Sequence, residues 1–131
     1  MSISIPEKFQ EDNLGKNAYI DRESISHDLS VANRDRIFYL NDAKKIEQVC
    51  VDACKIEGLQ VLNTYSHQFE PQGVTCTITL GESHLSCHTW PEKNCVALDI
   101  FTCGAKNPRC VAFWVLEYFD TDDYVMNDYA R

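Results

Sequence analysis

The run Val74-Thr-Cys-Thr-Ile-Thr-Leu80 decides the fold, because β-branched residues dominate it and favour a strand. Gly81 follows as a turn residue, and Leu85 to Thr89 then predict the hairpin partner of that strand. The composition of Cys95-Val-Ala-Leu-Asp-Ile-Phe101 predicts the next strand. Strands joined by such short links pair in antiparallel fashion, so the middle of the chain predicts an antiparallel sheet.

Two amphipathic helices flank these strands. Asn41 or Asp42 caps the first helix, which ends at Gly58, and the pair Asn107-Pro108 begins the second. Their apolar residues recur every three or four positions: Ala43, Ile46, Val49, Cys50, Ala53 and Cys54 in the first, and Val111, Ala112, Val115 and Phe119 in the second. Each helix therefore has one apolar stripe. The expected fold class is α+β, a two-layer α/β sandwich whose antiparallel sheet carries helices on one face.

Other segments carry weaker patterns. A short strand is expected at Ala18-Tyr-Ile20, with a weak continuation through Ile25. Another is expected from Gln60 to Ser66, and a final one around Tyr124 to Tyr129. Phe69-Glu-Pro-Gln-Gly73 predicts a turn or loop. The pattern of Ile37-Phe-Tyr-Leu40 fits either a strand end or a packed loop.

Length and composition indicate one globular domain over residues 1–131. Of the 131 residues, 44% are hydrophobic and 24% are charged, as in soluble proteins. No apolar run approaches the roughly 20 residues that a membrane span needs. The first residues, Met1 to Lys8, lack the basic and apolar regions of an export signal. We therefore expect a cytoplasmic protein with no membrane partner.

The charge and the cysteines narrow the function further. A formal net charge of -8 without a basic cluster disfavours nucleic acid as a partner. The cysteine count is odd and no export signal accompanies it, so free thiols are expected rather than disulfides. Their spacing includes no C-x-x-C pair, which argues against a metal site. Cys50 and Cys54, four apart on the first helix, fit small core residues.

Reactive side chains are concentrated between Phe69 and Gly104. They are Thr75, Glu82, Ser83, His84, Ser86, Cys87, His88, Glu92, Asp99 and Cys103. Only every second residue of a strand shares a face, so contact between Ser83 and His88 does not follow from their spacing. Spacing alone thus marks the region without assembling a site.

The same region carries a resemblance to a known family. The run Gly81-Glu-Ser-His-Leu-Ser-Cys-His-Thr-Trp-Pro-Glu92, followed by Leu98-Asp-Ile-Phe-Thr-Cys-Gly104, resembles the processing and catalytic signature of prokaryotic S-adenosylmethionine decarboxylase proenzymes. Phe69-Glu-Pro-Gln-Gly-Val-Thr75 is similar to the loop that precedes this signature in the family. The likeness covers about a third of the chain, with fixed residue types at fixed spacing.

The resemblance implies that the chain cuts itself between Glu82 and Ser83. Ser83 would attack the carbonyl of Glu82, and elimination of the resulting ester would give dehydroalanine. This residue would tautomerise and lose ammonia to leave a pyruvoyl group at position 83, the later Schiff-base site. The products would be residues 1–82, the beta chain, and residues 83–131, the alpha chain. His88 resembles the histidine that accepts a proton in this processing, a task that suits an imidazole near neutral pH. Thr75 stands where the family has a serine that supports processing.

The resemblance also implies a decarboxylation and its substrate. Cys103 resembles the proton donor that acts after carbon dioxide leaves. The self-made pyruvoyl group would be the cofactor, with no pyridoxal phosphate and no metal. Phe69 resembles the ring that stacks on adenine, and Glu92 the carboxylate that binds the ribose hydroxyls. Leu85 is expected in the wall of the same pocket.

Three functions remain open from the sequence. The first is decarboxylation of S-adenosylmethionine for spermidine biosynthesis, which retained Phe69 and Glu92 favour. The second is a related pyruvoyl-dependent ornithine or arginine decarboxylase, because the pair Thr75-Cys76 and the segment Lys93-Asn-Cys-Val96 depart from the family pattern. Cys76 stands where a glycine is common, and its side chain is expected to crowd the loop. The third is an uncut homologue that binds without catalysis. The resemblance further implies a homodimer or higher homo-oligomer with active sites between protomers.

Overall fold

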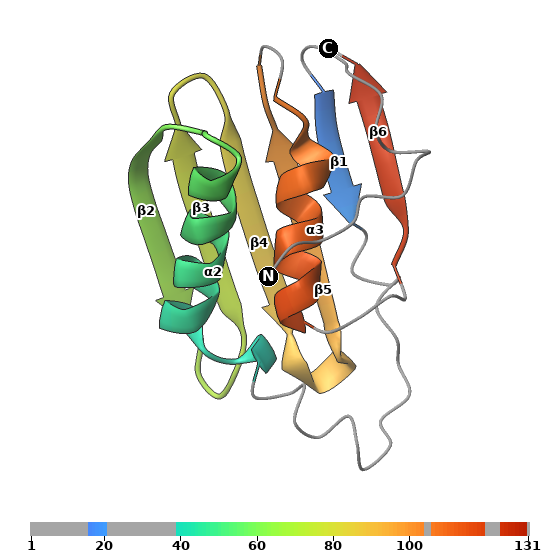
Figure 1. Ribbon diagram of the computed structural model, residues 1–131. Coiled ribbons are helices and arrows are strands. Elements are labelled where there is room, and N and C mark those ends of the chain that lie inside the picture. The colour runs from blue at the N-terminus through green and yellow to red at the C-terminus, as the bar shows by residue number, and fades with distance from the viewer. Residues whose placement is uncertain (1–15, 21–38, 104–105, 120–123, 131) are drawn as a thin grey trace.

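The computed structural model describes residues 16–20, 39–103, 106–119 and 124–130. Six strands form one sheet in the order β2-β3-β4-β5-β1-β6, and every neighbouring pair is antiparallel. The strands are β1 (Lys16–Ile20), β2 (Val61–Gln68), β3 (Val74–Leu80), β4 (His84–Trp90), β5 (Cys95–Phe101) and β6 (Met126–Ala130). The three middle strands predicted from the sequence therefore lie side by side as consecutive hairpins (Figure 1).

Both long helices lie on the same face of the sheet, α2 (Ala43–Ile56) over β2 and β3 and α3 (Pro108–Phe119) over β5 and β1 (Figure 1). Asp42 caps α2 by accepting a hydrogen bond from the backbone N–H of Lys45, and Gly58 beyond its end has a φ of 75°. Asn107 accepts a hydrogen bond from the N–H of Arg109 at the start of α3. The expected two-layer α/β sandwich is confirmed.

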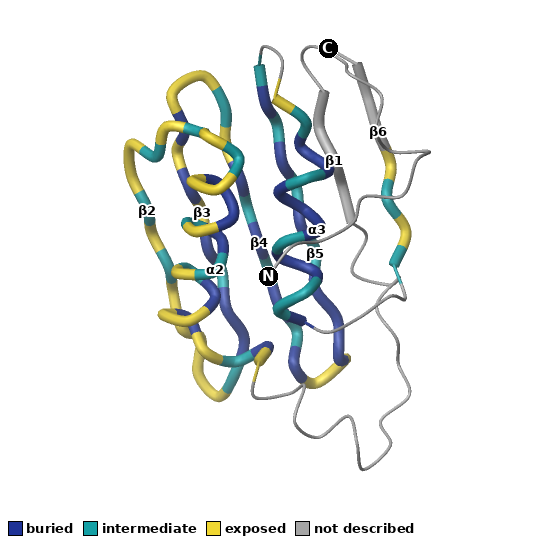
Figure 2. The backbone as a smooth tube through the Cα atoms, viewed as in Figure 1, coloured by how far each residue is buried: buried dark blue, intermediate teal, exposed yellow. Residues whose placement is uncertain are grey.

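Strand alternation separates a buried face from an open face (Figure 2). Val74, Ile78 and Leu80 of β3 point toward the helices and are at most 2% exposed. Their neighbours Thr77 and Thr79 are exposed on the opposite face. Burying one such aliphatic side chain contributes about 1.5–3 kcal/mol, so the helix-covered face supplies the folding energy and the open face is available for chemistry.

One local expectation was wrong. Tyr39 and Leu40 are helical, whereas the sequence pattern of residues 37–40 had suggested a strand end or a loop. Leu40 is 2% exposed, and its carbonyl accepts a hydrogen bond of 2.6 Å from the hydroxyl of Thr89. A buried apolar side chain whose backbone is hydrogen-bonded fits a short helix, a strand end or a loop, so the sequence pattern did not distinguish these elements. The expected continuation of the first strand toward Ile25 lies outside the described residues.

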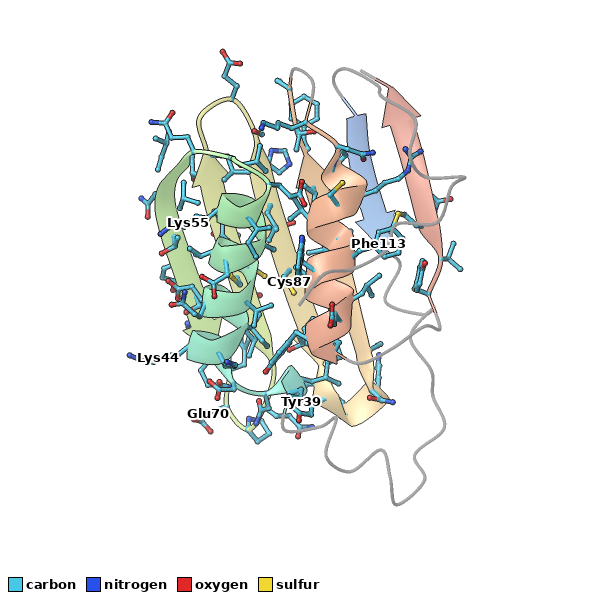
Figure 3. All side chains as sticks on the ribbon, viewed as in Figure 1. Tyr39, Lys44, Lys55, Glu70, Cys87 and Phe113 are labelled. Carbon is cyan, nitrogen blue, oxygen red and sulfur yellow. The ribbon has the colours of Figure 1, made fainter. Side chains whose placement is uncertain are left out.

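The core contains a group of thiols. Cys50 and Cys54 of α2 face Cys76 and Cys87, which pair across β3 and β4, and all four are 0% exposed. Cys87 lies between the sheet and the helix layer (Figure 3). Contacts with the thiols of Cys76 and Cys87, together with burial, raise the pKa of Cys50. The expectation that Cys50 and Cys54 are core residues is confirmed, and all seven cysteines are free.

One carboxylate ties α2 to the edge strand β2. Thr64 donates a hydrogen bond of 2.7 Å to Glu47, and the hydroxyl of Ser66 donates to the second oxygen. These two hydrogen bonds, Ser66 first, lower the pKa of Glu47. Because the pKa of Glu47 is lower in the folded state than in the unfolded chain, the ionised carboxylate stabilises the fold at pH values above the unfolded-state pKa. This contribution is lost as the pH falls through the folded-state pKa.

We therefore expect Glu47→Gln to lower the free energy of unfolding at pH 7 by about 1 kcal/mol, a value reduced for partial exposure. The difference from the wild type should shrink as the pH falls below about 4, where the carboxylate becomes protonated. Urea unfolding at pH 7 and at a pH below about 4 measures this difference in the free energy of unfolding. Asp52→Asn on the same helix, whose carboxylate accepts a hydrogen bond from the neighbouring Gln48, is the matched control and should change stability by less than about 0.5 kcal/mol.

Candidate active site

Both ends of β4 carry residues singled out from the sequence. The β3–β4 turn, with Glu82 and Ser83, lies at one end of the sheet, and the β2–β3 loop and the short 3-10 helix η4 (Pro91–Lys93) lie at the other (Figure 1). The sheet therefore divides the predicted site residues into two groups. Each group has its own geometry.

A pocket of about 350 Å³ lies at the η4 end. Its walls include four residues predicted from the sequence, namely Phe69, Thr75, His88 and Glu92. The edge of His67 packs against Phe69, with ring centroids 4.5 Å apart and an interplanar angle of 75°. Gln72 donates a hydrogen bond of 3.3 Å to Glu92, which fixes the carboxylate at the rim. The pocket thus combines an aromatic face with an oriented acceptor.

The β3–β4 pairing places Thr75 opposite His88 on the open face. Their side chains share a hydrogen bond of 2.9 Å between Thr75 Oγ1 and His88 Nδ1. This contact fixes the imidazole ring and leaves its Nε2 atom for another group. A serine hydroxyl in place of Thr75 would make the same bond, so the threonine keeps the required chemistry and adds a methyl group.

At the opposite end, a tight turn holds Glu82 and Ser83. The N–H of Leu80 donates to the carbonyl of Ser83 at 3.0 Å, and the N–H of Gly81 donates to the carbonyl of Gln60 at 3.0 Å. The thiol of Cys103 donates a hydrogen bond of 3.1 Å to the carbonyl oxygen of Glu82. A donor on this oxygen stabilises the negative charge that develops when a nucleophile adds to the carbonyl carbon.

The two groups are far apart within one chain. Five residues separate Ser83 from His88 along β4, and a strand rises about 3.3 Å per residue, so their backbones lie roughly 16 Å apart. The structure brings Ser83 together with Glu82 and Cys103, and it brings His88 together with Thr75, Phe69 and Glu92. One chain does not join the serine to the histidine.

Two expectations about side chains were wrong. Leu85 was expected in the pocket wall, but it lies on the helix-covered face of β4 and is 1% exposed. Its parity along the strand is opposite to that of His88, which is why it belongs to the core. Cys76 was expected to crowd the loop before the turn, yet it lies inside β3 and packs under α2. The segment after Glu92, Lys93 to Val96, does not contribute to the lining of the pocket.

Among the residues of the pocket that sequence reasoning did not single out are Trp90 and Gln72. Trp90 is two positions after His88, so strand alternation puts both on the open face, and their ring centroids are 6.3 Å apart. That signal was present in the sequence. Gln72 carried no such signal, because a loop residue reaches Glu92 only through the folded geometry.

Exposure and position distinguish Cys103 from the other cysteines. Five cysteines are buried, and burial raises the pKa of one of them, Cys54, to about 12. Burial also raises the pKa of the partly exposed Cys110 to about 11. Cys103 is the other partly exposed cysteine, and its thiol lies at the turn that holds Ser83. It is therefore the cysteine placed to exchange a proton with a ligand.

No group of His, Cys, Asp or Glu side chains among the described residues has the arrangement of a metal site. Within the same residues, no helix has both the length and the apolar character required to cross a bilayer.

Comparisons with known proteins agree on one family. The family model for S-adenosylmethionine decarboxylase matches residues 24–131. An S-adenosylmethionine decarboxylase proenzyme of Syntrophomonas wolfei is 40% identical over 97 residues, which make up 73% of this chain and 77% of the relative. The proenzyme of Moorella thermoacetica is 41% identical over 93 residues, covering 70% and 74%. That of Thermococcus kodakarensis is 42% identical over 81 residues, covering 61% and 57%.

A solved structure has the same fold. The crystal structure of the adenosylmethionine decarboxylase from Aquifex aeolicus matches with a TM-score of 0.75 over 92% of each chain, at 20% sequence identity. The match supports the sheet order and the one-sided helix layer.

Proposed function

Because the chain belongs to the S-adenosylmethionine decarboxylase family, we propose that it cuts itself between Glu82 and Ser83 and then decarboxylates S-adenosylmethionine. The product would be the aminopropyl donor for spermidine synthesis, made in the cytoplasm. The hydrogen bond from Cys103 to the carbonyl of Glu82 carries this proposal, because it polarises the one bond whose cleavage the activity requires.

Groups from two copies of this chain account for the cut. The hydroxyl of Ser83 adds to the Glu82 carbonyl carbon while the Cys103 thiol stabilises the oxyanion, and collapse of the adduct moves the acyl group from nitrogen to oxygen. A base then removes the Cα proton of residue 83, and Glu82 leaves with its new C-terminal carboxylate, which gives dehydroalanine. The imine tautomer of dehydroalanine adds water and releases ammonia, which leaves the pyruvoyl group. With Nδ1–H donating to Thr75, the Nε2 atom of His88 of the partner subunit is free to accept the Cα proton.

The residues at the turn fit the pyruvoyl group that this reaction would leave. A partly buried serine immediately precedes β4, the Cys103 thiol lies beside the adjacent carbonyl, and none of the described helices lies on the open face. When formed, the group supplies a ketone that condenses with the substrate amine and takes up the electrons left by carbon dioxide. Cys103 would then return a proton to the substrate carbon.

The distance within one chain supports a homodimer as the active unit. β4 is an inner strand of the sheet, so a second chain can reach both of its ends only across the open face. A two-fold axis that lies between two stacked sheets, perpendicular to the strands and level with residues 85 and 86, places Ser83 of one protomer near His88 of its partner. The same operation gives two equal sites per dimer.

The η4-end pocket supports the choice of substrate. Phe69 offers a flat ring for a base, Glu92 offers two acceptor oxygens for a vicinal diol, and Trp90 adds a second aromatic surface. Glu70, which projects from the β2–β3 loop (Figure 3), adds a second carboxylate and so favours a cationic sulfonium. A linear basic amino acid has neither a base nor a diol to occupy these groups.

Mass spectrometry and a substrate comparison test the proposal. The purified protein should give two chains, residues 1–82 and 83–131, with the second blocked at its N-terminus by a carbonyl that hydroxylamine traps. Carboxyl-labelled S-adenosylmethionine, ornithine and arginine should release labelled carbon dioxide from the first alone. A chain that stays whole after long incubation would support a binding homologue instead, and release only from ornithine or arginine would refute the substrate.

Glu92→Gln should raise the KM for S-adenosylmethionine about tenfold with little change in self-cleavage, because a charged acceptor for the diol becomes a neutral one. Steady-state kinetics of carbon dioxide release measure the change. Glu70→Gln, in the same pocket but exposed, is the control for loss of negative charge alone and should change KM by about twofold or less. Equal effects of the two changes would mean that Glu92 acts only through its charge.

A further inference from the structure

His84 carries an interaction that the proposed reaction does not use. Its Nε2 atom lies 3.7 Å from a carboxylate oxygen of Asp99, the ion pair found among the described residues. Its ring also stacks on Phe101, with centroids 5.8 Å apart and planes inclined at 30°. Two contacts from β5 therefore hold an imidazole immediately after the residue at which the chain is proposed to cut.

The register brings this imidazole to the same corner as Cys103. His84 pairs with Phe101 across β4 and β5, and Cys103 is two positions beyond Phe101. Alternation continues past the end of β5, because Thr102 is buried with its hydroxyl bound to the carbonyl of Lys106. Cys103 therefore shares the open face with Phe101 and His84, as a diagonal neighbour of the ring.

The contact of the Cys103 thiol with Glu82 agrees with this placement, since Glu82 is two residues before His84. The described titratable groups at this corner are Asp99 on β5, Glu82 in the turn and Cys103 itself. On the other side of β4, the residue opposite His84 is Thr79 of β3, which does not titrate. The carboxylate that contacts the ring is thus that of Asp99.

We propose, on the basis of the proposed function, that His84 is a positioning residue that resupplies Cys103 with its proton after each turnover. When carbon dioxide has left, the S–H bond of Cys103 breaks, a C–H bond forms on the substrate carbon, and a thiolate remains. An N–H bond of the His84 imidazolium then breaks and the S–H bond forms again. An imidazolium gives up a proton more readily than a thiol, so this transfer is downhill.

The overall reaction consumes one proton per carbon dioxide released, so the thiol must be reprotonated after each turnover. In the single chain the His84 side chain is 48% exposed and the Asp99 side chain 35%, and both lie on the open face that the proposed dimer covers. Within that dimer the ring is thus a proton donor beside the thiol inside the shared site.

The first test uses S-adenosylmethionine turnover. His84→Gln should lower kcat about tenfold near pH 6 with KM changed less than about twofold. The size of the difference should depend on pH, because only a protonated ring can donate to the thiolate. Added imidazole should restore kcat of His84→Ala in proportion to its protonated fraction, which a purely structural role would not allow. Thr79→Val, the cross-strand control, should behave like the wild type.

The second test needs no substrate, so it separates this proposal from the proposed function. Alkylation of Cys103 by iodoacetamide, followed by peptide mass spectrometry, reports its thiolate. In His84→Gln the rate near pH 6 should fall about threefold, because the neighbouring positive charge that favours the thiolate is gone. The alkylation rate of Cys103 in Asp99→Asn should lie between the rates in the wild type and in His84→Gln. Identical alkylation profiles, or an unchanged kcat across pH, would overturn the role of His84, even if the wild type decarboxylates as proposed.

Discussion

Ser83→Ala is expected to remain a single chain of 131 residues and to release no carbon dioxide from S-adenosylmethionine. The methyl group of alanine lacks the oxygen that must add to the Glu82 carbonyl, and no other hydroxyl replaces it in the β3–β4 turn. Denaturing electrophoresis and intact mass after long incubation measure the cut. Labelled carbon dioxide measures the activity. No cleaved chain should appear, and the release of labelled carbon dioxide should not exceed that of buffer alone.

A second serine on the same strand gives a matched control. Ser86 lies on the open face of β4, opposite Thr77 and Asp99, three residues from the expected cut. Ser86→Ala should be cut like the wild type and should show the same two masses. Cleavage of the Ser83→Ala chain at residue 82 would show that another group attacks this carbonyl. A cut at a different bond would show that the peptide bond between Glu82 and Ser83 is not the one that the chain cleaves.

The fold was largely predictable because its signals are local. The β-branched run of β3, the cap at Asp42 and the pair Asn107-Pro108 each fix their own element, and the structure confirms all three. Short links between β3, β4 and β5 leave antiparallel pairing as the simple solution. The helical turn at Tyr39 was missed because its stability depends on distant contacts, such as the bond from Tyr118 to the carbonyl of Tyr39.

The candidate site was predictable in its residue types but not in its arrangement. The sequence named Ser83, His88 and Cys103 without showing which of them meet. Register supplies the answer, because it pairs Thr75 with His88 and carries Cys103 back to the turn at Glu82. Leu85 shows that closeness in sequence is not enough. It lies an odd number of positions from His88 along β4, so its side chain faces the core and not the site.

Mixing two inactive variants tests the proposed dimeric site. In a dimer of a Ser83→Ala chain with a His88→Ala chain, one composite site has lost both groups and the other is complete. The complete site joins Ser83 of the His88→Ala chain to His88 of the Ser83→Ala chain. We therefore expect the His88→Ala chain to be cut in the mixed dimer, although each variant alone stays whole.

Co-expression with different tags and tandem purification isolates the mixed dimer, and intact mass shows which chain is cut. In the purified mixed dimer every His88→Ala chain has a Ser83→Ala partner, so all of these chains should be cut. In the mixture before tandem purification, equal and random assembly would give about half. The Ser83→Ala chain should stay whole in every case. If serine and histidine of the same chain formed the site, neither chain would be cut.

A double variant makes the contrast stricter. When Ser83→Ala and His88→Ala are placed in one chain and this chain is paired with the wild type, both composite sites lack one group. The wild-type chain of that mixed dimer should then stay whole, even though it carries every residue of the proposed site. A wild-type chain that is still cut beside the double variant would mean that the roughly 16 Å between the two ends of β4 is bridged within one protomer.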